Sequence, residues 1–235
     1  MTLVYEGKAK KLFTTEAPNE LLMEFKNSAT AFNGVKKAEF EGKGRMNKAL
    51  TLQLYRQLEN RGVATHFVRD AGEIALIVKK VSIVPIELVV RNVIAGSLQK
   101  RTGLPEGREL KQPIVELYYK DDALGDPLIN DDHVRELELA TPDELVTLRS
   151  YGLKVNELLK EFFGAGGLRL VDFKLEFGRL ADGSGTIVLA DEISPDTCRL
   201  WDAKTGEKLD KDRFRFDLGD PMAGYAEILK RLNVE

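Results

Sequence analysis

The chain has 235 residues, of which 43% are hydrophobic, and its formal net charge is −3. This length suits one large domain or two closely associated ones, and the hydrophobic content is enough for a sizeable core. The slightly acidic balance argues against a nucleic-acid partner, because general nucleic-acid binders carry a basic excess. Two histidines and one cysteine exclude a multi-histidine metal site and an intramolecular disulfide, so a divalent cation would have to bind carboxylates, as magnesium does.

Hydropathy along the chain predicts a protein without a membrane segment. The first residues lack the apolar run of a signal peptide. The most hydrophobic window, residues 83–90, contains Pro85 and Glu87 and is far too short to span a bilayer. We therefore expect a cytoplasmic protein with no membrane partner.

The first part of the chain, residues 1–82, is predicted to form a β-rich unit with one helix. Apolar residues at four-residue spacing predict that helix, and Gly62 is expected to end it; they are Met46, Leu50, Leu54 and Leu58. The other expected elements are strands over residues 4–13, 21–25, 66–69 and 73–81 and a loop over residues 26–34. Pro85 restricts the residue before it, so residues 82–85 are a plausible hinge.

The second part, residues 83–235, is predicted to mix strands and helices, which makes the whole chain α+β. Thr141, Pro142 and Glu144 are typical of a helix start, because the threonine caps, the proline fits the first turn and the glutamate completes a capping box. The expected elements are a strand over residues 86–93, a polar stretch with turns over residues 95–127, a helix over residues 141–164, a hairpin of residues 169–177 with 186–192, and a helix over residues 221–232.

The most informative segment for chemistry is the first strand of that hairpin. Side chains alternate along a strand, so Asp172, Lys174 and Glu176 share one face while apolar side chains occupy the other. A solvated sheet face would have the same pattern. The returning strand ends at Asp191, and if the register brings Asp191 close to Glu176, the two carboxylates repel each other unless a cation lies between them. Because a one-residue slip would put Asp191 on the wrong face, this arrangement needs a bulge or a suitable loop.

Several other polar groups are weaker candidates when each is taken alone. Gly7 is followed by lysines at positions 8 and 10, which suits a polyphosphate but also suits a solvated hairpin. Arg91 stands at a strand end before the small residues 95–97, where a phosphate or carboxylate could bind or where an ordinary surface turn could lie. Arg199 follows the acidic strand closely and is expected to point into the same site.

Together these segments resemble the SAICAR synthetase family of purine biosynthesis. The matching segments follow in order along the chain: residues 5–10 (YEGKAK), 87–92 (ELVVRN) with 95–97 (AGS), 120–123 (KDDA) with 126–127 (DP), 171–178 (VDFKLEFG), 191–197 (DEISPDT) and 210–214 (DKDRF). The resemblance covers nearly the whole chain. It implies an N-terminal β-rich nucleotide-binding domain, a larger α+β domain with the magnesium and substrate sites, an ATP cleft between them, and a homodimer or higher homo-oligomer.

The resemblance also implies an activity and a role for each matching residue. ATP, L-aspartate and the carboxyaminoimidazole ribonucleotide CAIR would give the succinocarboxamide SAICAR, ADP and phosphate. The implied ATP-binding residues are Lys8, Ala9, Lys10, Val81, Ser82, Ile83 and Glu87, and the implied magnesium ligands are Glu176 and Asp191. The implied substrate-binding residues are Arg91, Ser97, Asp126 and Arg199. Lys120, Asp172 and Lys174 would act near the reacting groups. Some relatives carry aspartate where this chain has Asn33, so no role is transferred to that position.

The residues alone leave two other functions open. A small-molecule kinase would have the same nucleotide-binding parts. A non-catalytic nucleotide-binding module would bind ATP without turnover. In the ligase reading, Asp172 or a neighbouring carboxylate would accept the proton that the aspartate amine loses.

Overall fold

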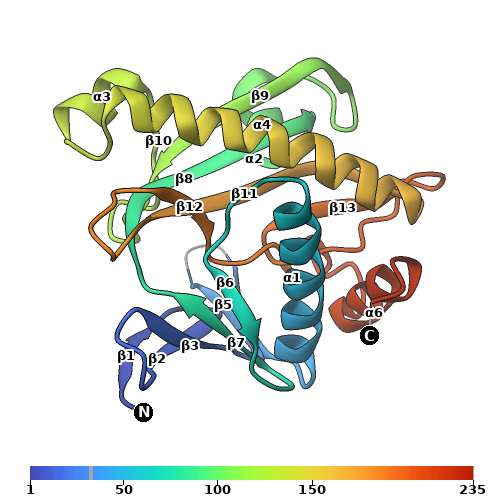
Figure 1. Cartoon of the computed structure of the whole chain (residues 1–235). Helices are drawn as coiled ribbons and strands as arrows, with labels where there is room; N and C mark the ends of the chain where they lie inside the picture. The colour runs from blue at the N-terminus through green and yellow to red at the C-terminus, as the bar shows by residue number, and fades with distance from the viewer. Residues whose placement is uncertain (32–33, 235) are drawn as a thin grey trace.

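The computed structural model describes residues 1–31 and 34–234 and consists of antiparallel sheets with helices packed around them (Figure 1). A five-stranded sheet forms the N-terminal part. Its strands, in spatial order, are β1 (Leu3–Glu6), β2 (Lys10–Thr14), β3 (Glu20–Phe25), β7 (Ala75–Lys79) and β6 (Phe67–Asp70). A separate hairpin pairs β4 (Ser28–Ala31) with β5 (Lys36–Glu39).

A six-stranded sheet forms the larger part and carries most of the candidate residues. Its path runs through β10 (Leu128–Ile129), β9 (Glu109–Tyr119), β8 (Val81–Val93), β11 (Leu168–Leu180) and β12 (Ile187–Ala190), and β13 (Cys198–Asp202) also pairs with β11. The long strand β11 therefore pairs with three other strands, and side chains from β8 and β13 contact its polar face. The mixed sheets and helices confirm the α+β class.

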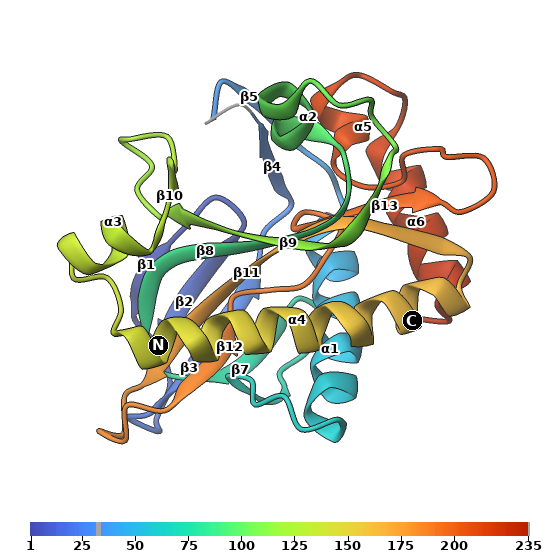
Figure 2. The same ribbon diagram turned by 90° about the horizontal axis from the view of Figure 1, so that it is seen from above.

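Helices cover this larger sheet and join it to the smaller one. They are α1 (Lys43–Asn60), α2 (Gly96–Thr102), α3 (Asp131–Glu136), α4 (Pro142–Ala165), α5 (Asp212–Arg215) and α6 (Pro221–Arg231). Helix α4 lies along the sheet that contains β8 and β11 (Figure 2). None of the helices in the described part of the chain combines the length and apolar character needed to cross a membrane.

Helix α1 packs against both sheets. Leu52 joins the small apolar cluster of the N-terminal sheet with Met23 and Leu76. Leu54 and Leu58, on another face of the helix, belong to the main core. The change from one sheet to the other falls between β7 and β8, close to residue 82. The division into two domains at that residue stays a prediction, because α1 contributes to both cores.

Two expectations about local structure are wrong. Residues 26–34 are not simply a loop, since Ser28–Ala31 pairs with Lys36–Glu39; small alternating side chains there gave no apolar pattern. The polar stretch of residues 95–127 contains α2 and the eleven-residue strand β9. The hinge proposed at residues 82–85 lies inside β8 and stays a prediction; Pro85 falls in the register shift between the pairs Ile83–Gly178 and Glu87–Glu176, where its missing N–H is tolerated.

Helix α4 begins at the predicted capping box. The Thr141 hydroxyl accepts from the Glu144 N–H at 3.2 Å, and the Glu144 carboxylate accepts from the Thr141 N–H at 2.8 Å. Arg179 of β11 donates to the same carboxylate at 2.6 Å. The Arg179 hydrogen bond lowers the pKa of Glu144 to about 2, against the opposing effect of burial.

We expect Glu144→Gln to lower the free energy of unfolding by about 1 kcal/mol at pH 7. The ordinary pKa of this carboxyl is 4.5 and its folded pKa is about 2, so its contribution is complete above pH 4.5 and is lost as the pH falls through 2. Urea unfolding at pH 7 and pH 3 measures the difference, which should shrink at pH 3. Glu157→Gln, at an exposed position of the same helix, is the control.

Candidate active site

The polar face of β11 is buried rather than solvated. Asp172 is 4% exposed and Glu176 is 5% exposed, while Phe173 and Phe177 on the other face lie in the core. A buried carboxylate needs cations or hydrogen-bond donors as partners, because its charge loses the solvation of water. The structure supplies those partners in two groups, one of lysines and one of arginines.

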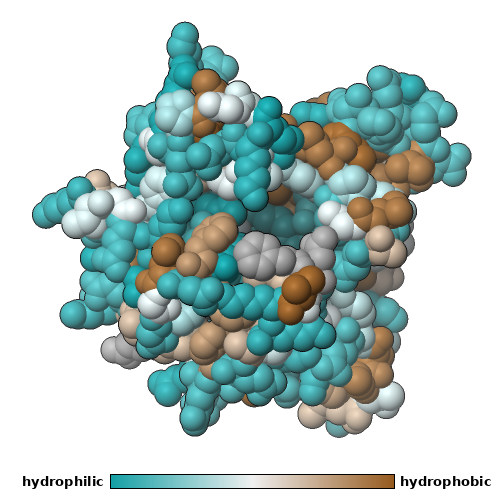
Figure 3. Space-filling model, turned by 180° about the vertical axis from the view of Figure 1, so that it is seen from behind, coloured by the Kyte–Doolittle hydropathy of each residue, from teal (hydrophilic) through white to brown (hydrophobic). Residues whose placement is uncertain are grey.

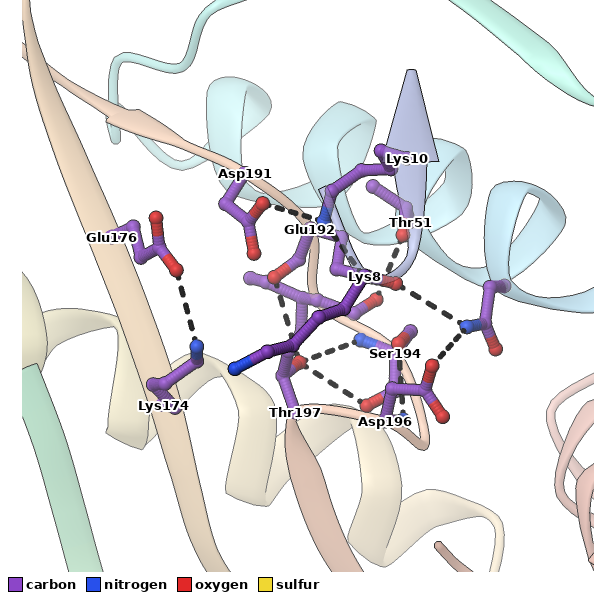
Figure 4. Close-up of polar contacts among 12 residues, drawn as sticks. Lys8, Lys10, Thr51, Lys174, Glu176, Asp191, Glu192, Ser194, Asp196 and Thr197 are labelled. Atoms are coloured by element: carbon purple, nitrogen blue, oxygen red, sulfur yellow. Dashed lines mark hydrogen bonds and ion pairs between the residues drawn. The ribbon is translucent and has the colours of Figure 1, made fainter. Parts of the chain in front are cut away.

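Asp191 reaches the site through an unusual backbone conformation. The residue directly opposite Glu176 is Ala190, so a regular strand would turn Asp191 to the other face. Asp191 instead has a φ of 63°, in the left-handed region. Figure 4 shows its carboxylate directed at Lys10, whose Nζ atom lies 2.5 Å from Asp191 Oδ1. The left-handed residue turns Asp191 off the regular alternation, which is the kind of irregularity that the prediction required; a cation shared by Asp191 and Glu176 stays a prediction.

The lysine group joins side chains from strands that are distant in sequence. Glu87 of β8 lies directly opposite Glu176 of β11. The Lys174 Nζ atom lies 2.5 Å from a Glu87 oxygen and 3.1 Å from a Glu176 oxygen, and the Lys120 Nζ atom lies 2.9 Å from the same Glu176 oxygen. Burial by itself would lower the pKa of Lys174, but the neighbouring carboxylates raise it well above its usual value. The lysines therefore stay charged.

Lys10 completes this group from the N-terminal sheet. Its Nζ atom lies 2.5 Å from Asp191 Oδ1 and 2.7 Å from Glu192 Oε1. Burial opposes the charge on Lys10, but these two carboxylates raise its pKa above the ordinary value. The structure thus brings cations and carboxylates from both parts of the chain together at one place.

The arginine group lies two residues away from Lys174 on the same strand face. Asp172 accepts from Arg91 Nη1 at 2.8 Å and from Arg199 Nη1 at 2.9 and 3.0 Å. Arg91 also donates to Ser97 Oγ at 2.9 Å and to Glu116 at 2.7 Å. Both guanidinium groups are thereby fixed in orientation. This arrangement suits recognition of an anionic ligand group.

Arg199 is packed closely against the backbone of Gly96. A Cβ atom on Gly96 would lie 2.8 Å from Arg199 Nη2, and the φ of Gly96 is +54°, so a glycine is needed there on both counts. On its other side, Arg199 Nε donates to Asp212 Oδ2 at 2.9 Å. Burial would lower the pKa of Arg199, but Asp172 and Asp212 raise it.

The other predicted site residues lie outside these two groups of contacts. Lys8 is half-exposed and pairs with Asp122 at 2.6 Å, and Asp126 caps the same loop by accepting from the Asp121 N–H at 3.0 Å. Ala9 contributes a backbone carbonyl that accepts from Lys26. Val81, Ser82 and Ile83 form the start of β8, with Ser82 and Ile83 exposed. Asn33 lies outside the described residues.

Sequence reasoning missed several members of the site. Glu192 is 2% exposed and binds Lys10, although it directly follows the predicted Asp191. Glu116 and Tyr118 of β9 hold Arg91 and were hidden in a stretch expected to be irregular. Asp212 lies in residues 210–214, one of the segments that resemble the family. The acidic residues at alternate positions 210 and 212 were the signal that could have identified it.

The residues present fit a magnesium ion that is shared with a phosphate ligand. Within residues 1–31 and 34–234, no group of three or more His, Cys, Asp or Glu side chains is placed to hold a metal by itself. Glu176 and Asp191 offer hard oxygen donors, and magnesium is usually held by one or two carboxylates together with substrate phosphates and water. On the face of the molecule shown in Figure 3, hydrophilic side chains border part of a hollow.

Comparisons with known proteins agree with this architecture over the full chain. The SAICAR synthetase family model matches residues 3–232. A phosphoribosylaminoimidazole-succinocarboxamide synthase from Akkermansia muciniphila is 61% identical over 99% of this chain and 98% of its own length. A crystal structure of this enzyme from Ehrlichia chaffeensis has a TM-score of 0.97 and 44% identity over 99% of both chains. A SAICAR synthetase solved in complex with ADP has a TM-score of 0.93 and 55% identity, covering 97% of this chain and 96% of its own. The chain belongs to the SAICAR synthetase family.

Proposed function

We propose that this protein is an ATP-dependent carbon–nitrogen ligase that joins L-aspartate to the carboxylate of CAIR and releases SAICAR, ADP and phosphate. Membership of the family supports this reaction. The observation that carries it furthest is the polar face of β11, where a lysine–carboxylate group and an arginine–carboxylate group stand side by side. The first group suits a nucleotide polyphosphate and the second suits an anionic substrate. A reaction between the two ligands needs both groups.

The nucleotide is assigned to the lysine group. A similar SAICAR synthetase was solved with ADP, which supports a nucleotide site in this chain. Lys10 approaches from the N-terminal sheet and Glu87 of β8 contacts Lys174, while Lys8 and residues 81–83 are assigned to the nucleotide site from the family resemblance. We assign the phosphates to the lysines, with Ala9 in the covering turn, and the adenine to residues 81–83.

The reaction must first make the CAIR carboxylate electrophilic. A carboxylate reacts poorly with amines because oxide would have to leave. Attack of a CAIR carboxylate oxygen on the γ-phosphorus breaks the bond to ADP and forms an acyl phosphate. The aspartate nitrogen then bonds to the acyl carbon, phosphate leaves, and the amine loses a proton. Lys10, Lys120 and Lys174 favour the first step by stabilising the negative charge on the transferred phosphoryl group.

Glu176 and Asp191 are the residues that would hold magnesium in this scheme. A bound magnesium ion would supply further positive charge to the phosphate oxygens. In this structure, lysines form ion pairs with both carboxylates and balance their negative charges. A bound polyphosphate would give those lysines a second anionic partner, and the carboxylates would keep an oxygen free for the metal.

CAIR is assigned to the arginine group, with Arg91, Ser97 and Arg199 as its ligands and Asp126 bordering the site. Asp172 already accepts three contacts from guanidinium nitrogens. We therefore assign it to holding the arginines in place rather than to accepting the amine proton. The family resemblance also leads us to propose a cytoplasmic location and a homo-oligomeric assembly. Sedimentation of the purified protein would test the assembly.

The deciding experiment follows ADP formation by the purified protein with ATP and magnesium while CAIR or aspartate is omitted in turn. The proposed ligase is expected to form SAICAR and ADP in equal amounts only when both are present. ADP formation with CAIR alone, together with a stable phosphorylated product, would identify a small-molecule kinase. ATP binding without turnover under every combination would identify a non-catalytic module.

A further inference from the structure

Asp210 is a buried carboxylate outside the two ligand groups. It connects two backbone segments, the one that carries Arg199 and the one that carries its partner Asp212. Asp210 has no exposed surface. Its Oδ2 atom accepts from the Leu200 N–H at 2.8 Å, and its Oδ1 atom accepts from the Asp212 N–H at 2.8 Å. No lysine or arginine in the described part of the chain forms an ion pair with it. Both oxygens of Asp210 are thus used by backbone groups.

One of those backbone groups belongs to the residue that follows Arg199, and the other belongs to the residue with which Arg199 forms an ion pair. Leu200 directly follows Arg199 on β13, and Asp212 is the residue that accepts from Arg199 Nε. Arg199 in turn donates to Asp172 through Nη1. One buried carboxylate therefore holds the backbone from which both side chains of the Arg199–Asp212 pair extend.

The burial of the Asp210 carboxylate costs free energy of folding, so a role for this residue is worth identifying. Burial, and then the negative charge of Asp212, raises the pKa of Asp210 to about 7, while the positive charge of Arg199 opposes the increase. Asp210 is thus coupled to the same ion pair electrostatically as well as through the backbone. A purely structural loop anchor would not need to lie so close to these charges.

We propose that Asp210 is a positioning residue that sets the direction of the Arg199 guanidinium toward CAIR by holding Leu200 and Asp212. The inference rests on the proposed function for the identity of the ligand. It predicts that the loss of Asp210 affects the CAIR site selectively. Asp210→Ala should raise KM for CAIR about tenfold or more, with KM for ATP and kcat changed by less than about threefold.

The test compares Asp210→Ala and Asp210→Asn with Asp202→Asn as a matched control. Asp202 also accepts two backbone N–H groups at the end of β13, from Lys204 and Thr205, but it does not contact the Arg199 pair. Asp210→Asn keeps one acceptor oxygen, so it should fold and show a smaller increase in KM for CAIR than Asp210→Ala. Asp202→Asn should lower the unfolding temperature and leave KM for CAIR unchanged.

Two results would overturn the inference: an unchanged KM for CAIR in both Asp210 variants, or equal losses for CAIR and ATP. If the wild-type chain itself lacks ligase turnover, the proposed function fails, and the role of Asp210 is judged from a crystal structure of Asp210→Asn. A displaced Arg199 guanidinium supports the positioning role in that case. An unmoved one refutes it.

Discussion

Glu176→Gln is expected to lower kcat/KM of the ligase reaction by about a thousandfold or more while the protein stays folded. The glutamine has nearly the same shape, but it removes the charge that faces Lys120 and Lys174 and the oxygen donor assigned to magnesium. Asp191→Asn should cause a loss of similar size. Asparagine tolerates the left-handed backbone that this position requires, so its effect reports on the carboxylate rather than on strain.

The measurement is the steady-state rate of SAICAR formation over a range of magnesium concentrations, with circular dichroism to verify folding. Asp182→Asn is the control, because Asp182 lies in the turn of the same hairpin and only caps that turn through Ser184. It should keep the wild-type rate. Normal turnover in both the Glu176 and the Asp191 variant would show that these carboxylates do not hold the metal.

The parts of the fold that the sequence predicted correctly are those whose signals are local. The capping box of α4 needs only four consecutive residues, and its hydrogen bonds form as expected. The alternation on β11 likewise depends on one strand, and it correctly separated the charged side chains from the core. Such patterns identify an element and its faces without information about what lies opposite.

The parts that could not be predicted depend on pairing between distant segments. Nothing near Lys10 in sequence shows that its partner is Glu192, 182 positions away. That Glu87 faces Glu176 follows from the register of β8 on β11, which a bulge near Pro85 shifts. The left-handed backbone at Asp191 was not predicted either, because aspartate carries no strong local signal for that conformation; the sequence required only a bulge or a suitable loop.

The burial of the polar face of β11 was also beyond sequence reasoning. A strand with three ionisable residues on one face is more often solvated, and here side chains distant in sequence, Arg91, Lys120 and Arg199, contact that face and accompany its burial. Tertiary structure therefore decided between the two readings of the same residues.

Arg199→Ala is expected to weaken CAIR binding about a hundredfold, which corresponds to about 3 kcal/mol, while the affinity for ATP changes by less than about threefold. Arg199 lies between Asp172 and Asp212, so it presents a fixed guanidinium plane to the ligand and belongs to the arginine group rather than the lysine group. Arg199→Lys should recover only a small part of the loss. A lysine keeps the charge but cannot make both side contacts in that fixed geometry.

Calorimetric titration of each variant with CAIR and with ATP separates the two affinities. Arg213→Ala is the matched control, because Arg213 pairs with Glu207 at 2.7 Å, lies in the same short segment as Asp212 and does not touch Arg199. It should leave both affinities unchanged. If Arg199→Ala lowered the affinities for CAIR and ATP equally, Arg199 would be holding the site together as a whole. The selective loss is expected because its contacts reach the ATP-binding lysines only through the backbone of β11, where Asp172 and Lys174 stand two residues apart on one face.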